Sequence, residues 1–226
     1  MERLVVLEGL DGSGKSTQLK ELHKYLEGIG EKVKTIKLPD YDNPSSTLVK
    51  MYLGGEFGDD PSAVNAYAAS TFYAVDRYAS FNIGWKKEYE AGTWILADRY
   101  TTSNISYQMT KLPKTDWNVY MEWLTEFEYE KLELPKPDLV IFLDMPVSVS
   151  QKLMTKRYGG DESEKDIHES HVDYLNSCRE AAMAAAERFG WVIINCSENG
   201  KPLSIEEISK KIVKTVEEKF SFKAVE

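Results

Sequence analysis

Cysteine and histidine are scarce in this sequence. Its 226 residues include two cysteines, Cys178 and Cys196, and three histidines, His23, His168 and His171. Two thiols are too few for a disulfide framework, and neither residue type shows the spacing of a metal site. The scarcity argues against a disulfide-stabilised secreted scaffold and favours reduced thiols in a cytoplasmic protein.

Positive charge and long apolar runs are also lacking. Lys and Arg number 28 against 37 Asp and Glu, so the net charge is −9 and there is no basic excess for a nucleic-acid polymer. No window approaches the roughly 18 uninterrupted apolar residues of a membrane span. The first residues lead straight into a strand-like run instead of a signal peptide. We therefore expect a cytoplasmic protein that binds neither membranes nor nucleic-acid polymers.

The rest of the composition is that of an ordinary globular chain, with 42% apolar and 29% charged residues. A chain of this length can build one substantial core and is short for two, so we expect a single domain over residues 1–226. If such an acidic protein binds nucleotides, a few well-placed Lys and Arg side chains must create a local positive field.

A glycine-rich segment stands out near the N-terminus. Residues 9–17 read GLDGSGKST, between an apolar run at residues 4–7 and a helix-patterned stretch. The pattern GxxxxGK[ST] in this setting is typical of a phosphate-binding loop, and an ordinary strand-to-helix turn would not need Lys followed by Ser. The sequence therefore predicts a nucleotide enzyme.

Each position of this loop has a physical role. The glycines permit positive φ angles, which turn successive N–H groups inward toward a phosphate. Lys15 offers an ammonium to the β- and γ-phosphates, and the Ser16 hydroxyl can ligate Mg²⁺, the only metal we expect. The predicted ATP-binding residues are Gly9, Gly12, Ser13, Gly14, Lys15, Ser16 and Thr17.

Short apolar runs alternate with helical patterns along the chain, which predicts βαβ units and a parallel sheet. Five strands are expected at residues 4–7, 33–38, 94–97, 139–143 and 191–194. Helices are expected at residues 15–27, 45–53, 61 to about 91, 116–129, 147–157, 168–189 and 205–220. The expected fold is α/β with three layers, a five-stranded parallel sheet flanked by helices, and ligands should gather at the carboxyl ends of its strands.

Two further segments are polar and site-like. Asp98 and Arg99 directly follow the strand at 94–97; Asp98 could support the Mg²⁺ shell and Arg99 could clamp a phosphate, or the two could form an internal ion pair. Residues 156–166, KRYGGDESEKD, combine paired glycines with dense mixed charge. This stretch is either a solvated connection or part of a mobile lid at about residues 152–168 that closes over ATP.

Several motifs occur together in one order: the loop GLDGSGKSTQ, FYAVDR at residues 72–77, DRYTTSN at 98–104 followed by Tyr107, and LPKPDLVIFLD at 134–144. In these motifs the chain resembles the thymidylate kinases, which transfer the γ-phosphoryl group of ATP to dTMP and give dTDP. The resemblance covers nearly the whole chain. It implies a P-loop kinase fold, ATP and dTMP as substrates, and a homodimer formed through helices.

The resemblance also implies roles for individual residues. Tyr73 would stack on thymine, Arg77 and Asn104 would hydrogen-bond the base, and Tyr107 would crowd the 2′ position and so favour deoxyribose. The implied substrate-binding residues are Asp11, Tyr73, Arg77, Arg99, Tyr100, Asn104 and Tyr107. The implied catalytic residues are Asp11, Lys15, Asp98, Arg99 and Arg157, with Ser16 and Asp98 at the metal.

A kinase of this kind needs no general base. The acceptor phosphate has a second pKa of about 6 and is largely a dianion near neutral pH, so it can attack directly. Positioning and cations must then supply most of the catalysis.

The sequence departs from the family pattern in the phosphate-binding loop. Some members carry an arginine where this chain has Gly12. A cation must therefore come from elsewhere, and we expect Arg157, assisted by Lys156 or Lys165, to close onto the transferring phosphate.

The second departure lies at residues 38–41, which read LPDY, whereas the family commonly has Phe-Pro followed by an arginine. Asp40 would repel an acceptor phosphate if it pointed inward. Either Asp40 faces solvent while Tyr41 donates a hydrogen bond, or the enzyme is a deoxynucleoside kinase whose carboxylate deprotonates a 5′-hydroxyl. A P-loop switch NTPase is a third hypothesis, but the sequence has neither an NKxD segment nor a clear switch sequence.

Overall fold

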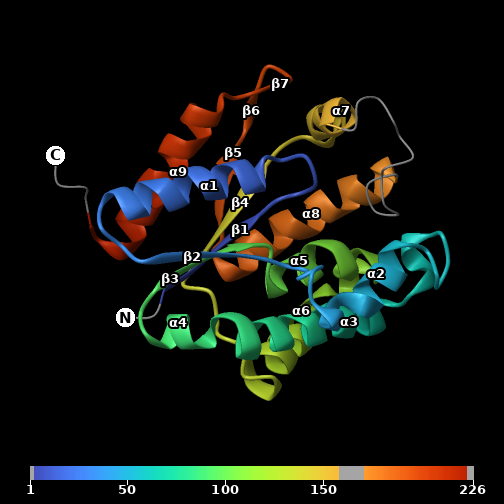
Figure 1. Cartoon of the computed structure of the whole chain (residues 1–226). Coiled ribbons are helices and arrows are strands. Elements are labelled where there is room, and N and C mark those ends of the chain that lie inside the picture. Colours follow the sequence, from blue (N-terminus) through green and yellow to red (C-terminus); the bar gives the residue numbers. More distant parts are fainter. Residues whose placement is uncertain (1–2, 158–170, 223–226) are drawn as a thin grey trace.

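The computed structural model describes residues 3–157 and 171–222. Five parallel strands form a sheet in the order β2-β3-β1-β4-β5, as expected from the sequence (Figure 1). Their bounds are β1 Arg3–Glu8, β2 Val33–Lys37, β3 Trp94–Asp98, β4 Leu139–Asp144 and β5 Val192–Asn195. β1 lies at the centre, so the loop that follows it emerges from the middle of the carboxyl edge.

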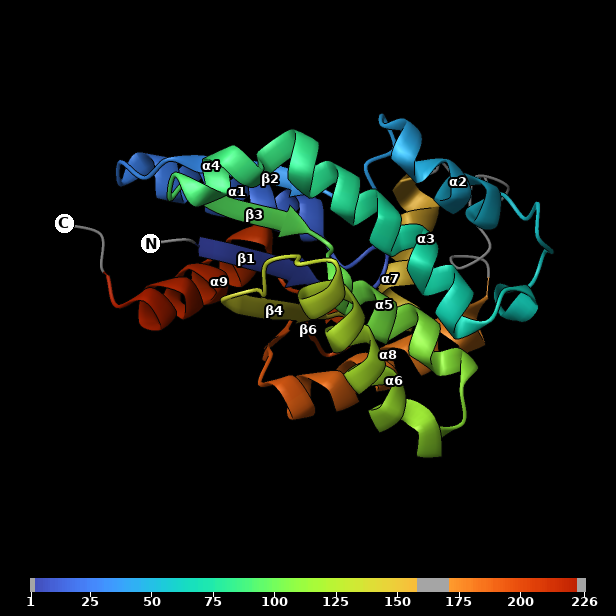
Figure 2. The same ribbon diagram turned by 90° about the horizontal axis from the view of Figure 1, so that it is seen from below.

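Helices cover both faces of this sheet. The described helices are α1 Lys15–Gly28, α2 Thr47–Leu53, α3 Ala66–Ala79, α4 Lys86–Glu90, α5 Thr101–Gln108, α6 Trp117–Thr125, α7 Val147–Arg157, α8 Val172–Phe189 and α9 Ile205–Phe220. α1 and α9 lie on one face, and α3, α5, α6 and α8 lie on the other (Figures 1 and 2). The predicted three-layer α/β fold is therefore confirmed.

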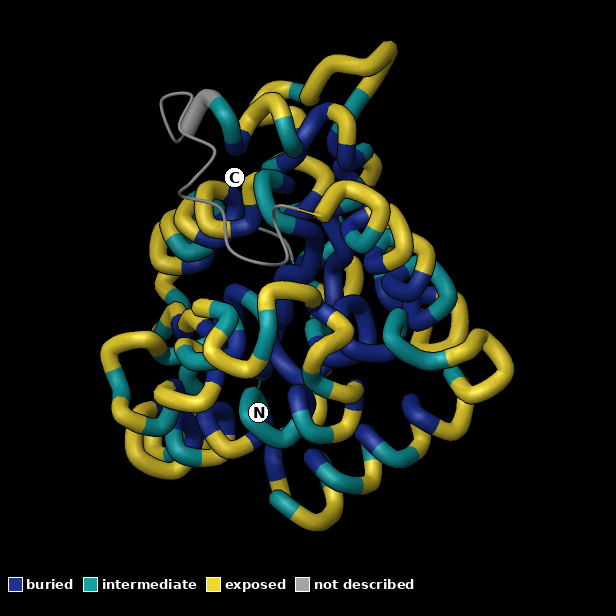
Figure 3. The backbone as a smooth tube through the Cα atoms, turned by 90° about the vertical axis from the view of Figure 1, so that its right-hand side faces the viewer, coloured by how far each residue is buried: buried dark blue, intermediate teal, exposed yellow. Residues whose placement is uncertain are grey.

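Alternating residues of β1 explain the two cores. Val5 and Leu7 pack with Leu22 of α1 on one face, whereas Leu4 and Val6 pack with the cluster on the other. All four strand residues are fully buried, as is usual for a parallel strand covered on both sides. In Figure 3 the interior strands are accordingly dark, and the exposed residues lie on the outer helices and loops.

The predicted helix from residue 61 to about 91 is interrupted. A short 3₁₀ turn, Pro61–Ala63, precedes α3, whose first turn is capped by the Asn65 side chain accepting from the N–H of Ala68 at 2.9 Å. A π-helical turn, Ser80–Trp85, then separates α3 from α4. The predicted helix over residues 116–129 likewise passes from α6 into a π-helical turn, Glu126–Lys131.

α5 was not expected from the sequence. Its residues, TTSNISYQ, include several poor helix formers, and its N-cap residue Tyr100 makes no side-chain cap. The carboxylate of Glu8, from the end of β1, instead accepts from the Tyr100 N–H at 3.3 Å, from the Thr102 hydroxyl at 2.6 Å and from Ser103 at 2.8 Å. A residue far away in the sequence therefore caps this helix, which local propensity does not reveal.

Candidate active site

The phosphate-binding loop has the backbone conformation that its glycines predict. Gly9, Gly12 and Gly14 have φ angles of 152°, 76° and 90°, and Gly14 is the N-cap of α1. Lys15 begins the helix, and its ammonium donates to the carbonyl oxygens of Gly9 at 2.9 Å and Leu10 at 3.1 Å. The cation is thus held over the concave side of the loop, where a phosphate would bind.

Electrostatics at Lys15 reflect its crowded surroundings. Burial lowers the pKa of the Lys15 ammonium, and the neighbouring Arg99 cation lowers it further, while Asp11 and Asp98 act in the opposite direction. The buried hydroxyl of Ser13, in the same loop, has no hydrogen-bond partner among the described residues. An incoming phosphate would supply the Ser13 hydroxyl with a partner and would give the Lys15 ammonium an anion to neutralise.

Asp98 and Ser16 meet where β3 ends and α1 begins. The pairing of Leu7 with Asp98 in the sheet places Asp98 beside the loop, and the Ser16 hydroxyl donates to its carboxylate at 2.6 Å. The internal Asp98–Arg99 ion pair that the sequence left open does not form here, because Arg99 pairs with Asp11 instead. A hydroxyl and a carboxylate at this point are suitable ligands for Mg²⁺, whose other ligands would be phosphates and water.

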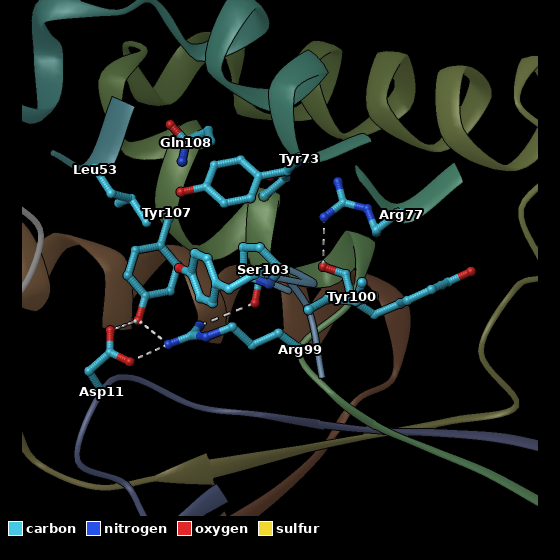
Figure 4. A pocket seen from close by; sticks show the side chains of 13 residues that line it. Asp11, Leu53, Tyr73, Arg77, Arg99, Tyr100, Ser103, Tyr107 and Gln108 are labelled. Atoms are coloured by element: carbon cyan, nitrogen blue, oxygen red, sulfur yellow. Dashed lines mark hydrogen bonds and ion pairs between the residues drawn. The ribbon is translucent and has the colours of Figure 1, made fainter. Parts of the chain in front are cut away.

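Arg99, Asp11 and Tyr107 form a closed hydrogen-bonded triangle (Figure 4). Arg99 Nη2 donates to Asp11 Oδ1 at 2.6 Å and to the Tyr107 hydroxyl at 3.0 Å, and that hydroxyl donates to Asp11 Oδ2 at 2.9 Å. The Arg99 guanidinium also lies over the Tyr107 ring, 4.9 Å from its centroid. Arg99 has a φ of 69°, an uncommon backbone angle for a residue other than glycine.

This triangle keeps Asp11 ionised. Burial alone would raise the pKa of the Asp11 carboxyl, but the Arg99 and Lys15 cations and the Tyr107 hydrogen bond outweigh it and hold that pKa well below its usual value. Asp11 therefore carries a full negative charge between two cations at neutral pH.

One pocket adjoins the triangle, and its walls come from the loop after β2, from α3, and from α5 with the two residues that precede it. All seven predicted substrate-binding residues line it, although they are scattered over almost a hundred positions of the sequence. They are Asp11, Tyr73, Arg77, Arg99, Tyr100, Asn104 and Tyr107. The pocket also includes residues that the sequence did not single out, such as Leu53, Ser103 and Gln108.

A family model described as thymidylate kinase matches residues 7–212. The chain belongs to the thymidylate kinase family. It is 31% identical over 216 residues to a probable thymidylate kinase of Thermococcus gammatolerans, with 95% of each chain covered. It is also 31% identical over 160 residues to thymidylate kinase of Mycobacterium tuberculosis, covering 70% of this chain and 71% of that one.

The fold is similar to a solved thymidylate kinase from Candida albicans, with a TM-score of 0.71, 23% sequence identity, and coverage of 100% of this chain and 95% of that chain. The family model and the two relatives confirm the sequence-based prediction of this family and of a kinase. The alternatives, a deoxynucleoside kinase and a switch NTPase, are not favoured by these matches.

The departure at residues 38–41 has a structural explanation in this thymidylate kinase family member. Pro39 and Tyr41 are among the residues that line the pocket, and Asp40 is not. The Asp40 N–H donates to the carboxylate of Asp76 at 2.8 Å, so the turn is tied to α3. Burial and the nearby Asp76 raise the pKa of the Asp40 carboxyl. Asp40 is therefore not part of the wall that would surround an acceptor phosphate.

Two functional-looking carboxylates escaped the sequence reasoning. Glu8 was hidden as the last residue of an apolar strand, although a charge at the end of a buried strand was a usable signal. Glu128 lies in the π-helical turn that follows α6, four residues after the buried Leu124, and its side chain is 0% exposed. It forms a two-point ion pair with Arg77, through Nε at 2.7 Å and Nη2 at 2.5 Å.

The lid falls largely outside the described residues. α7 runs over the predicted range and ends at Arg157, so the expected catalytic arginine stands at its C-terminus. Lys165 and His168 lie outside the described residues, as does most of the predicted lid at about 152–168. In the described part of the chain, no helix is long and apolar enough to cross a membrane, and no three His, Cys, Asp or Glu side chains cluster as a metal site.

Proposed function

We propose that this chain transfers the γ-phosphoryl group of ATP to dTMP, giving ADP and dTDP for dTTP synthesis. The single observation that supports it best is the junction of two sites. The pocket that holds the seven predicted acceptor residues meets the phosphate-binding loop at the contact between Arg99 and Asp11. An acceptor phosphate bound by Arg99 would therefore lie next to the phosphates held by Lys15.

The reaction needs one bond formed and one broken. An oxygen of the dTMP phosphate attacks the γ-phosphorus of ATP, and the bond from that phosphorus to the β,γ-bridging oxygen breaks, which leaves ADP. Lys15 neutralises charge on the transferring group, and Arg99 positions the attacking phosphate. Asp11 holds Arg99 and Tyr107 in place and so orients the acceptor, without accepting a proton from it.

Mg²⁺ is the cofactor of this proposal. Ser16 and Asp98 would hold it, and when bound it would neutralise phosphate charge and orient the triphosphate. The loop residues Gly9, Gly12, Ser13, Gly14 and Thr17 would surround the β- and γ-phosphates with N–H and hydroxyl donors.

The remaining assignments are also proposals. The chain would act as a single kinase domain with a lid at about residues 152–168, in the cytoplasm. A homodimer is supported by three exposed apolar residues along α3 and the π-helical turn after it, Val75, Tyr78 and Ile83, with 53%, 47% and 79% exposure. Light scattering on the purified protein, with Ile83→Asp as the disrupting variant, tests the dimer.

A coupled ADP-release assay tests the activity. ATP and Mg²⁺ are supplied with dTMP, dUMP, dCMP or thymidine, and dTMP should give the highest kcat/KM. Transfer to thymidine but not to dTMP would show a deoxynucleoside kinase instead. ATP turnover in the absence of any acceptor would indicate a switch NTPase.

A further inference from the structure

The base end of the pocket is organised by a buried carboxylate that touches both predicted base-reading side chains. Glu128 Oε2 accepts from Arg77 Nε, and Oε1 accepts from Arg77 Nη2 and from Asn104 Nδ2, the last at 3.1 Å. The side chains of Arg77 and Glu128 are 3% and 0% exposed. Solvent therefore hardly competes for these hydrogen bonds.

The neighbours of Asn104 determine which way its amide points. Its Nδ2 group lies 3.2 Å from the backbone oxygen of Ser70 and 3.1 Å from the carboxylate of Glu128. Both neighbours accept only, so the two N–H groups of the amide must face them. The Asn104 oxygen, an acceptor, is then the polar atom left for a bound base, because Asn104 lines the pocket.

Arg77 offers the opposite polarity. Its guanidinium has five N–H groups, of which two are bound by Glu128 and one lies 3.4 Å from the Tyr100 backbone oxygen. The remaining groups can only donate. Burial opposes the charged form of Arg77, but the Glu128 carboxylate outweighs this effect and raises the pKa of the guanidinium. Arg77 thus stays a donor at every working pH.

The backbone around Glu128 explains how a carboxylate reaches this position. Glu128 belongs to the π-helical turn Glu126–Lys131, in which the helix widens, and its carbonyl oxygen accepts from the N–H of Leu134 at 3.0 Å. π-helical turns occur frequently at functional sites because they shift a side chain out of the regular helical register. Here the Glu128 carboxylate meets Arg77 of α3 and Asn104 of α5.

From these contacts we propose that Glu128 is a positioning residue that sets the hydrogen-bond polarity of the base site, with an acceptor at Asn104 beside donors at Arg77. A base with an N3–H donor beside an O4 acceptor, thymine or uracil, satisfies both. Cytosine presents an acceptor at N3 and an amino donor at position 4, so it faces both groups with the wrong polarity. The inference rests on the proposed nucleotide function and names the residue that orients the two side chains expected to bind the base.

Glu128→Gln tests the inference most directly. A glutamine amide can donate to the Asn104 oxygen, so only the Ser70 oxygen still favours the present orientation of the Asn104 amide, and glutamine binds Arg77 less firmly. We expect kcat/KM for dTMP to fall at least tenfold, mainly through KM, and the dUMP:dCMP ratio of kcat/KM to fall at least tenfold. Glu130→Gln, an exposed position on the same turn, should leave both unchanged.

Glu128→Asp separates the effect of the carboxylate's charge on base preference from the effect of the side chain's length on packing. It keeps the acceptor charge on a shorter stem, so activity should fall while the preference for dUMP over dCMP persists. Collapse of that preference in the aspartate variant, or its full retention in the glutamine variant, would overturn the inference.

A measurement on the unaltered protein covers the case in which both variants fail to fold. Calorimetric titration should show dUMP binding at least tenfold tighter than dCMP, and 3-methyl-dTMP binding at least tenfold more weakly than dTMP. Equal binding within either pair would refute the polarity assigned to the site. Absence of phosphoryl transfer to every monophosphate would instead refute the proposed function, so the two failures are distinguishable.

Discussion

Gly12 lies so close to α7 that a β carbon at this position would stand 2.7 Å from the backbone oxygen of Ser150. The same β carbon would meet the Met154 side chain at 2.9 Å, and the φ angle of Gly12 is 76°. The phosphate-binding loop therefore packs directly on α7. This contact gives a physical reason why the arginine found here in some relatives is missing.

Substituting Gly12 should accordingly destabilise the fold. Gly12→Ala should lower the free energy of unfolding by about 1–3 kcal/mol, because it adds both a clash and a strained φ angle. Urea unfolding measures this. Gly14→Ala is the matched control, since Gly14 also has a positive φ of 90° but nothing within 4 Å of a β carbon. Equal losses in the two variants would show that the contact with α7 contributes nothing.

Arg157→Ala tests the proposed lid cation. If Arg157 stabilises the transferring phosphoryl group, kcat should fall about 100-fold or more while the KM values for ATP and dTMP change little. Steady-state kinetics with both substrates varied measures the split. Lys152→Ala, an exposed position on the same helix, should be near wild type. An unchanged kcat in Arg157→Ala would remove this residue from the mechanism.

Asp98→Asn tests the predicted metal site. The variant keeps an oxygen that can accept from the Ser16 hydroxyl but loses the negative charge that favours Mg²⁺. We expect kcat to fall about 10–100-fold at a fixed Mg²⁺ concentration and the half-saturating Mg²⁺ concentration to rise. Titration of activity with MgCl₂ measures both. The same Mg²⁺ dependence as in the wild type would contradict a role of Asp98 at the metal.

Two substitutions of Tyr107 should separate the effect of its ring from the effect of its hydroxyl on the preference for deoxyribose. Tyr107→Ala removes the ring that is expected to crowd the 2′ position, so the preference for dUMP over UMP should fall about tenfold. Tyr107→Phe keeps the ring and should keep that preference, although it loses the hydrogen bonds to Arg99 and Asp11. The measurement is kcat/KM for both nucleotides in each variant. A preference that disappears in the phenylalanine variant would assign selectivity to the hydroxyl.

Because of Lys111, the free energy of unfolding should change with pH in the alkaline range. Its ammonium donates to the Tyr52 hydroxyl and the Val64 carbonyl oxygen, both at 2.8 Å, and burial lowers its pKa from 10.5 to about 8. Between about pH 8 and 10.5 the unfolded chain binds more protons at this residue than the folded chain, so its contribution makes the free energy of unfolding rise with pH. Lys111→Met should lose that rise relative to the wild type in urea unfolding at pH 8, 9 and 10. Parallel pH curves for the two proteins would contradict the lowered pKa.

The βαβ alternation allowed the sheet to be predicted almost residue by residue, because buried parallel strands are short apolar runs. The π-helical turns and α5 could not be predicted in this way. α5 depends on the distant carboxylate of Glu8, and the turn that carries Glu128 departs from the 3.6-residue period. In both cases a tertiary contact outweighs local propensity.

The phosphate-binding loop and the acceptor motifs were readable from the sequence, because loops that bind phosphate depend on short-range backbone geometry and on adjacent residues. Hydrogen-bond partners that lie far apart in the chain could not be read from the sequence. Three such contacts follow from how β1, β3, α3, α5 and the turn after α6 come together. Arg99 pairs with Asp11 instead of Asp98, the Asp40 N–H donates to Asp76, and Glu128 accepts from the Asn104 amide. The sequence by itself thus determined the family and the chemical groups at the site. Only the tertiary structure decided which side chains position those groups, because hydrogen-bond partners are set by distance in space and not by distance along the chain.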